Sequence, residues 1–209
     1  NFKFGTGKEI KINNKKIWAQ RLSYVGELGF ELYIKMEESK EIYKLIIDKG
    51  KEFNISHCGM FAMDTMRMEK GYLHWGHDIS PEENQYEAGL KFALSFKKNI
   101  DFIGKKTLLK IKDKKDNKNL VMLTLNNSKP GEPLLLHDEP IYSGKNIIGR
   151  TTSGNFSFNF NKNLAFGYIN SEHSKENLIK ENLFIEVEKK KYPASIILKP
   201  LNNKDIRSI

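Results

Sequence analysis

The stretch that decides the fold reads YVGELGFELYI, residues 24–34, and it is followed by MDTMRMEKGYLHWGHD, residues 63–78. In the first block, Gly26 and Gly29 allow the backbone to turn sharply before an extended run, FELYI. The second block begins with helical spacing that ends at Gly71. We interpret the two blocks as one wall of a binding site, and the sequence between them as scaffold.

A β-hairpin is predicted before the first block. KEIKINN, residues 8–14, alternates isoleucine with lysine, and a second extended run, KIWAQRLSY, begins at Lys16. Asn13 and Asn14 stand between the two runs, and asparagine tolerates the left-handed angles of a tight turn. The run FELYI is then expected to form a third strand.

Two helices are predicted between the blocks and within the second one. Residues 37–50 carry Ile, Leu and Ile at helical spacing, with Ser39 as the expected N-cap and Gly50 as the expected stop. A second helix is predicted over residues 60–70. Both assignments place ordinary amphipathic helices around the first block.

The next segment is predicted to hold a strand, a helix and a linker. Residues 90–96 alternate Leu, Phe, Leu and Phe with smaller or polar residues, which is typical of a strand. Asp101 is expected to cap a helix over residues 101–112, and the polar tract DKKDNKN, residues 113–119, is the expected linker.

After the linker the pattern changes to short apolar or alternating runs. Pieces rich in Gly, Pro, Asn and Ser separate these runs, and no helical spacing is found among them. Such a pattern predicts a small antiparallel barrel or a sandwich. The chain is therefore predicted to be α+β, with one domain over residues 1–112 and an all-β domain over residues 113–209.

Composition excludes several classes of protein. The chain has 209 residues, 39% of them apolar and 29% charged, which is typical of a globular protein. No apolar run approaches the roughly 20 residues of a membrane helix, the N-terminus has no signal-peptide pattern, and the single cysteine, Cys58, can form no intrachain disulfide. We expect a cytoplasmic protein, or a mitochondrial matrix protein if the source is eukaryotic.

The net charge of +9 raises the question of nucleic-acid binding. The lysines, however, alternate with acids in KIKDKKDNK, residues 110–118, or end a strand in EKKKY, residues 188–192, and arginines are few. A nucleic-acid groove more often combines arginines with exposed aromatics. We expect a solvated lysine surface with no nucleic-acid or membrane partner, whose positive field would attract a polyanionic small substrate.

Taken in order, the blocks resemble the folate-binding part of sarcosine and dimethylglycine dehydrogenases and, less closely, the aminomethyltransferase (T-protein) of the glycine cleavage system. The resemblance implies a partial T-protein-like folate-binding region followed by a small antiparallel β-barrel. The segments that carry it are YVGELGFELYI (24–34), GMFAMDTMRMEKGYLHWGHDIS (59–80), YEAGLKFALSF (86–96), DFIGKKTLL (101–109), EPIYSGKNIIGRTTSG (139–154) and LAFGYI (164–169).

By this resemblance the cofactor is tetrahydrofolate, and three residues are expected to bind it. Glu31 would accept the paired N–H groups of the pterin edge, an interaction that suits a carboxylate. Tyr24 would pack against the ring system, and Arg67 would lie near the glutamyl carboxylates. The role of Glu27 is less defined, since it could bind backbone groups in the glycine turn.

The residues by themselves leave other interpretations open. Glu31 also reads as a solvent-facing strand glutamate, and Arg67 could pair with Asp64 three residues earlier on the helix. His74, His77 and Asp78, with His57, are residue types that bind metal, but no helical i, i+4 pair supports a metal site, and none is expected. The resemblance implies loop and wall packing for this cluster.

The resemblance also exposes a departure. In the family, a segment before the YVGE block carries the aspartate that assists one-carbon transfer, and nothing upstream of Tyr24 matches it. The catalytic residues are therefore unknown, and a GxGxxG fingerprint for a flavin is also absent. We expect the C-terminal part of a larger polypeptide or the product of a split or shortened gene. FAD would belong to an upstream domain, and a separate chain could supply the missing segment.

Two classes of function remain at this stage. The first is the folate-binding part of a one-carbon transfer enzyme that forms 5,10-methylenetetrahydrofolate. The second is a folate-binding or assembly module without catalysis of its own, and a related demethylase or tRNA-modification factor is a further alternative. Fold alone does not choose among them.

Overall fold

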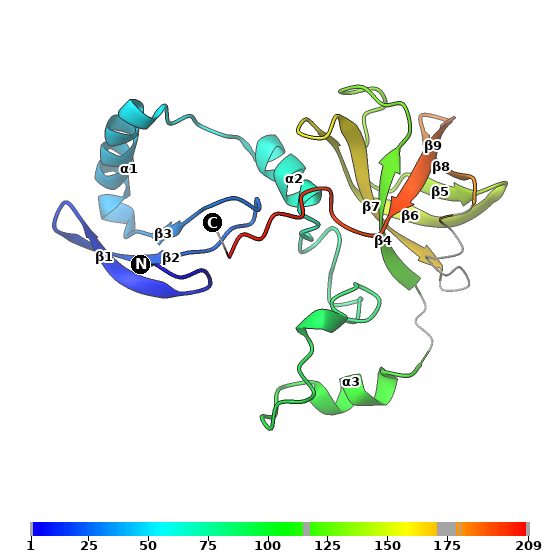
Figure 1. Ribbon diagram of the computed structural model, residues 1–209, viewed down its shortest axis with the longest axis horizontal. Coiled ribbons are helices and arrows are strands. Elements are labelled where there is room, and N and C mark those ends of the chain that lie inside the picture. Colours follow the sequence, from blue (N-terminus) through cyan, green and yellow to red (C-terminus); the bar gives the residue numbers. More distant parts are fainter. Residues whose placement is uncertain (1, 115–117, 171–178, 180, 208–209) are drawn as a thin grey trace. The chain divides into compact units, whose positions relative to one another are not determined.

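The computed structural model describes residues 2–114, 118–170, 179 and 181–207 (Figure 1). The chain forms two compact units, Asn1–Lys70 with Asn202–Ile209, and Gly71–Leu201. Among the described residues, none of the helices has the length and hydropathy that crossing a membrane requires. The predicted linker includes residues 115–117, which lie outside the described residues.

The first unit begins with a three-stranded antiparallel sheet in the order β1-β2-β3. The predicted hairpin is confirmed: β1 spans Gly7–Ile12, β2 spans Lys15–Gln20, and both turn asparagines between them have positive φ. The third strand, β3, spans Glu31–Tyr33 and pairs with β2. The loop between β2 and β3 contains the YVGE sequence.

Three helical segments complete this unit in sequence: α1 (Met36–Gly50), the short 3-10 helix η1 (Lys51–Phe53) and α2 (Met60–Glu69). Both helices were predicted, but Ser39 is not the N-cap of the first. The helix begins three residues before Ser39, whose hydroxyl donates to the carbonyl of Met36. Acidic residues in the first turn favour this earlier start because their negative charge interacts favourably with the positive end of the helix dipole.

The N-terminal part of the second unit differs from the prediction. Instead of a strand, residues 90–96 contain the 3-10 helix η2 (Lys91–Ala93), in which local i, i+3 hydrogen bonds satisfy the backbone. The helix α3 (Lys105–Ile111) begins after Gly104, which has φ 89°. Asp101 therefore does not cap it. Its carboxylate accepts the N–H of Phe102 instead.

The rest of the second unit is a closed antiparallel barrel with the strand order β4-β7-β6-β5-β8-β9. Of the two predicted alternatives, the barrel is confirmed and the sandwich is wrong. Strand β4 closes the barrel because it pairs with both β7 and β9. The strands are β4 (Lys118–Leu125), β5 (Pro140–Ser143), β6 (Asn146–Ser157), β7 (Lys162–Asn170), β8 (Leu183–Val187) and β9 (Lys190–Ile197).

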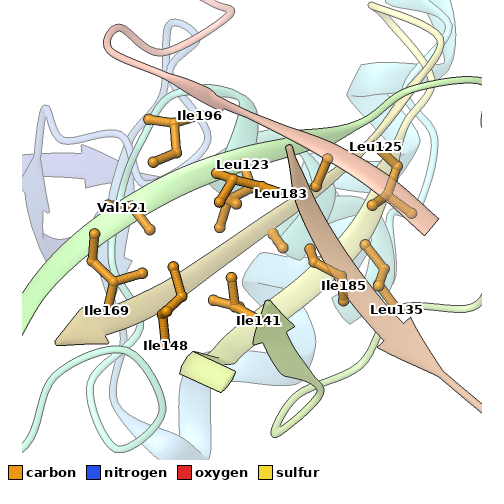
Figure 2. Close-up of a cluster of buried hydrophobic side chains, with 12 residues drawn as sticks. Val121, Leu123, Leu125, Leu135, Ile141, Ile148, Ile169, Leu183, Ile185 and Ile196 are labelled. Carbon is orange, nitrogen blue, oxygen red and sulfur yellow. The ribbon is translucent and has the colours of Figure 1, made fainter. Parts of the chain in front are cut away.

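Alternating side chains from all six strands fill the barrel, as the pleat requires. Figure 2 shows this core, in which aliphatic side chains from opposite strands meet around the axis. Its members are Val121, Leu123, Leu125, Leu135, Ile141, Ile148, Ala165, Ile169, Leu183, Ile185, Ala194 and Ile196. This core consists of aliphatic residues, most of them branched, and their burial stabilises the fold.

Candidate functional site

The three-stranded sheet of the first unit has one buried and one exposed face. Ile17 and Ala19 on β2 are each 1% exposed, whereas Trp18 between them is 46% exposed. On the neighbouring strand, Tyr33 is the cross-strand partner of Trp18 and is 54% exposed. The exposed face therefore carries an aromatic side chain on each of two adjacent strands, and aromatic faces suit a flat ring.

Glu31 lies on this same exposed face, because it stands two residues before Tyr33 on β3. The hydroxyl of Tyr33 donates a hydrogen bond of 2.8 Å to Oε2 of Glu31. This bond raises the pKa of the Tyr33 phenol, with a smaller contribution from the charge of Glu31. The predicted carboxylate is thus exposed, held by a neighbour and placed beside aromatic rings.

The loop that precedes β3 is shaped by its glycines. Gly26 has φ 77°, a conformation that L-residues seldom adopt, and an added Cβ at Gly29 would lie 3.0 Å from the carbonyl oxygen of Leu22. The predicted sharp turn is therefore present. Within it, Tyr24 is half-buried, and the carboxylate of Glu27 pairs with Lys204 at 3.4 Å.

Arg67 is the most deeply placed of the three predicted ligand residues. Its side chain is buried on α2, and both Nε and Nη2 lie 2.7 Å from Oδ1 of Asp64. The intrahelical pair that the sequence left open is therefore formed. A role for Arg67 toward a ligand stays a prediction, and so do the roles of Tyr24 and Glu31.

The HWGHD sequence lies in the second unit and has a structural role. Asp78 is 1% exposed, and its Oδ1 accepts the hydroxyls of Thr152 at 2.6 Å and Ser153 at 2.8 Å. Its Oδ2 accepts the backbone N–H of His74 at 2.9 Å, and its carbonyl accepts the hydroxyl of Tyr168. Asp78 thus fastens this loop to strands β6 and β7.

No group of three His, Cys, Asp or Glu side chains suited to a metal ion is found among the described residues. The imidazoles of His74 and His77 instead stack on each other, with ring centroids 4.6 Å apart. Stacked rings present their faces to each other and not their nitrogens to a common point.

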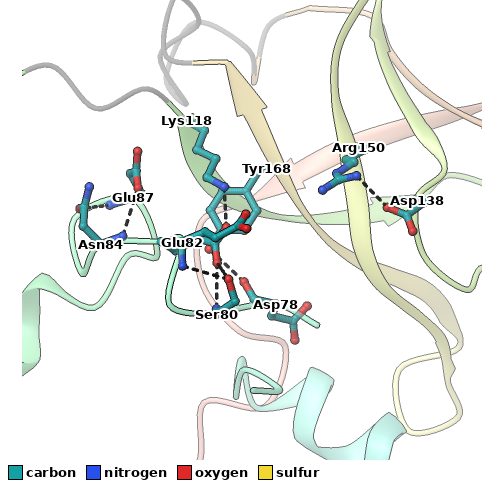
Figure 3. Close-up of polar contacts among 10 residues, drawn as sticks. Asp78, Ser80, Glu82, Asn84, Glu87, Lys118, Asp138, Arg150 and Tyr168 are labelled. Atoms are coloured by element: carbon teal, nitrogen blue, oxygen red, sulfur yellow. Dashed lines mark hydrogen bonds and ion pairs between the residues drawn. The ribbon is translucent and has the colours of Figure 1, made fainter. Parts of the chain in front are cut away.

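A polar cleft of about 610 Å³ lies next to this loop within the second unit. In this cleft Lys118 pairs with Glu83, and Arg150 lies 3.3 Å from Asp138. Figure 3 shows Lys118 beside the ring of Tyr168 and Arg150 facing Asp138. Burial would raise the pKa of Glu83, but the hydrogen bonds from Lys118 and Ser80 outweigh it and lower that pKa. Lys118 and Arg150 therefore each face an acid, and the Lys118–Glu83 pair ties the loop to strand β4.

Two residues of the exposed sheet face, Trp18 and Tyr33, were not among the site residues predicted from the sequence. The signal was available for Tyr33: in the strand ELY, the first and third residues must share a face. For Trp18 the strand register was needed, because only the pairing of β2 with β3 places it opposite Tyr33.

Comparison with known proteins gives a consistent picture. The model of the GCVT N-terminal domain matches residues 1–98, and that of the glycine cleavage T-protein C-terminal barrel domain matches residues 118–202. Human mitochondrial dimethylglycine dehydrogenase is 38% identical over 200 residues, which are 96% of this chain and 22% of that protein. An aminomethyltransferase of Symbiobacterium thermophilum is 36% identical over 172 residues, covering 82% of this chain and 45% of that protein.

Among solved structures, the chain is similar to the glycine cleavage system aminomethyltransferase T of Bartonella henselae. The TM-score is 0.80 at 24% identity, and the similarity covers 96% of this chain and 53% of that one. At this identity the likeness shows the fold. The chain spans 22% of the human dehydrogenase and 53% of the solved transferase. The predicted domain boundary at residue 112 stays a prediction.

Proposed function

Because the chain belongs to the glycine cleavage T-protein family, we propose that it is the folate-binding part of a tetrahydrofolate-dependent one-carbon transfer enzyme. The reaction would be of the aminomethyltransferase or the sarcosine/dimethylglycine dehydrogenase type, with 5,10-methylenetetrahydrofolate as the product. A flavin, if the whole protein uses one, would be bound by a part outside the residues of this chain.

The observation that carries the proposal is the exposed carboxylate of Glu31 on an aromatic sheet face. A reduced pterin is a flat ring system with an N–H and an amino group side by side on one edge. A carboxylate accepts such a pair in a bidentate arrangement, and aromatic faces such as those of Trp18 and Tyr33 suit the ring. The residues present therefore fit the group.

In this proposal the chain contributes positioning. Tetrahydrofolate, when bound, would supply the nitrogen that takes up the one-carbon unit. By binding the edge of the pterin, Glu31 would fix the orientation of the ring within its own plane. The half-buried Tyr24 would limit the tilt of the ring. Holding a reactant in one geometry accelerates a bimolecular step by lowering its entropic cost.

The test is calorimetric titration of the chain with tetrahydrofolate under anaerobic conditions. Glu31→Ala removes the paired acceptor, so the affinity is expected to fall about thirtyfold, which corresponds to about 2 kcal/mol. Glu52→Ala is the matched control, because Glu52 is an exposed glutamate of the same unit outside the sheet. This control is expected to bind like the wild type.

A folded wild-type chain that binds no tetrahydrofolate would contradict the proposal for this chain. Equal affinity of wild type and Glu31→Ala would leave folate binding intact but would remove Glu31 from the site. Circular dichroism of each variant establishes that the fold is retained before either result is interpreted.

A further inference from the structure

We propose that Tyr33 is a positioning residue for Glu31, whose carboxylate it holds in the orientation that a two-donor ligand edge requires. The inference rests on the proposed folate-binding role of Glu31. Tyr33 itself is assigned no contact with the pterin edge. The effect of its hydroxyl on binding would pass through the carboxylate that the hydroxyl holds, whereas its ring belongs to the aromatic sheet face.

The hydrogen bond leaves the carboxylate free for a ligand. The Tyr33 hydroxyl occupies one lone-pair position of Oε2, at 2.8 Å. A carboxylate offers about four such positions on its two oxygens, so Oε1 and the second lone pair of Oε2 remain available. A bidentate pair of N–H donors needs one acceptor position on each oxygen, so the number of positions allows both the Tyr33 bond and such a pair. The bond therefore orients Glu31 without competing for its function.

The local packing favours this orientation of Tyr33. An added Cβ at Gly7 would lie 2.6 Å from Cζ2 of Trp18, so the indole extends across β1 in the space that a glycine leaves. Trp18 thus leans toward β1, away from β3, where its cross-strand partner Tyr33 stands. The phenol ring can then lie along its own strand and reach Glu31 two residues before it.

The charge of Glu31 also favours the donating form of the hydroxyl. The hydrogen bond to Glu31 and then the nearby carboxylate raise the pKa of Tyr33 above its ordinary value. A tyrosine phenol is protonated at neutral pH in any case, and the raised pKa extends this donating form to more alkaline pH.

The first experiment titrates Tyr33→Phe with tetrahydrofolate beside the wild type. Without the hydroxyl the exposed glutamate samples several rotamers, and the affinity is expected to fall about fivefold. Tyr43→Phe is the matched control, because Tyr43 is an exposed tyrosine on α1 whose hydroxyl bonds His57 and not the sheet. It is expected to bind like the wild type.

A double-mutant cycle separates positioning from direct contact. If Tyr33 acts through Glu31, Tyr33→Phe should have no further effect in the Glu31→Ala background. Additive losses would show that Tyr33 contacts the ligand by itself and would overturn the proposal. An unchanged affinity of Tyr33→Phe beside a weakened Glu31→Ala would also overturn it, while leaving the proposed function in place.

A ligand-free measurement tests the pair directly. Subtracting the ultraviolet pH titration of Tyr33→Phe from that of the wild type isolates this phenol among the eight tyrosines. The pKa of Tyr33 is expected to lie above its ordinary value. In Glu31→Gln this pKa should return toward the ordinary value, and here the reference for the subtraction is the double variant that carries both Glu31→Gln and Tyr33→Phe. A merely structural tyrosine would not respond. If the pKa does not move, the pair is absent and the proposal fails independently of any folate result.

Discussion

Replacing Gly149 by alanine is expected to destabilise the barrel by about 3 kcal/mol or more. The reason is space, because an added Cβ would lie 1.9 Å from the carbonyl oxygen of Tyr168 and 2.9 Å from its carbonyl carbon. These are backbone atoms of the neighbouring strand β7, so no side chain can rotate to relieve the overlap. To relieve the overlap, β6 and β7 would have to move apart and break the ladder hydrogen bonds that join them within the barrel.

Hydrogen exchange measured by mass spectrometry on peptides from β6 and β7 checks this prediction, because it reports the stability of these strands within the whole chain. Gly144→Ala is the control. Gly144 has φ 58° but nothing within 4 Å of an added Cβ, so its substitution should cost only the backbone strain, about 1 kcal/mol. Equal effects at the two positions would contradict the argument from space.

The first hairpin, the barrel and Gly149 show what sequence patterns can and cannot predict. The asparagine pair and the alternating isoleucines of the first hairpin predicted its two strands and its turn correctly, because the signals are local. The barrel was predicted from repeated short runs, but its closure depends on β4 pairing with both β7 and β9. Why Gly149 must be glycine follows only from the pairing of β6 with β7, since its own φ requires nothing special.

The wrong predictions have one physical origin. Residues 90–96 alternate like a strand, yet they contain a 3-10 helix and pair with none of the described strands, and alternation describes a strand only where a partner strand is present. Asp101 has the chemistry of an N-cap, but Gly104 adopts a positive φ and the helix begins at Lys105. In both places the local side-chain pattern was not enough to decide the backbone conformation.

In the candidate site, too, features with a local signal were predicted, and features that depend on strand pairing or on distant residues were not. Glu31 was expected on a strand with its side chain opposite to its neighbours, and the structure places it so on β3. That it accepts the Tyr33 hydroxyl follows from the period of two, but that Trp18 stands across from Tyr33 follows only from the pairing of two strands. Asp78 was considered with two histidines as a ligand group, and residues more than seventy positions away make it a structural acceptor.

Asp78→Ala is expected to destabilise the second unit by about 3 kcal/mol, because it removes the acceptor of three donors at once. The hydroxyls of Thr152 and Ser153 and the N–H of His74 would lose their bonds, in surroundings that are buried at Ser153 and partly buried at Thr152 and His74. Each donor left without an acceptor costs about 1 to 3 kcal/mol, reduced where a water molecule can enter the space left behind.

Asp78→Asn distinguishes the loss of an acceptor from the loss of volume. The asparagine side chain has nearly the same size, but its amide nitrogen must face either the two hydroxyls or the N–H of His74, all of which donate to Asp78. We expect an intermediate loss of about 1 to 2 kcal/mol, measured by hydrogen exchange in residues 72–80 and in β6. If asparagine were as stable as aspartate, these hydroxyls would have to find other acceptors, and the loop would not depend on the carboxylate. If asparagine were as damaging as alanine, charge rather than acceptor geometry would hold the loop on the barrel.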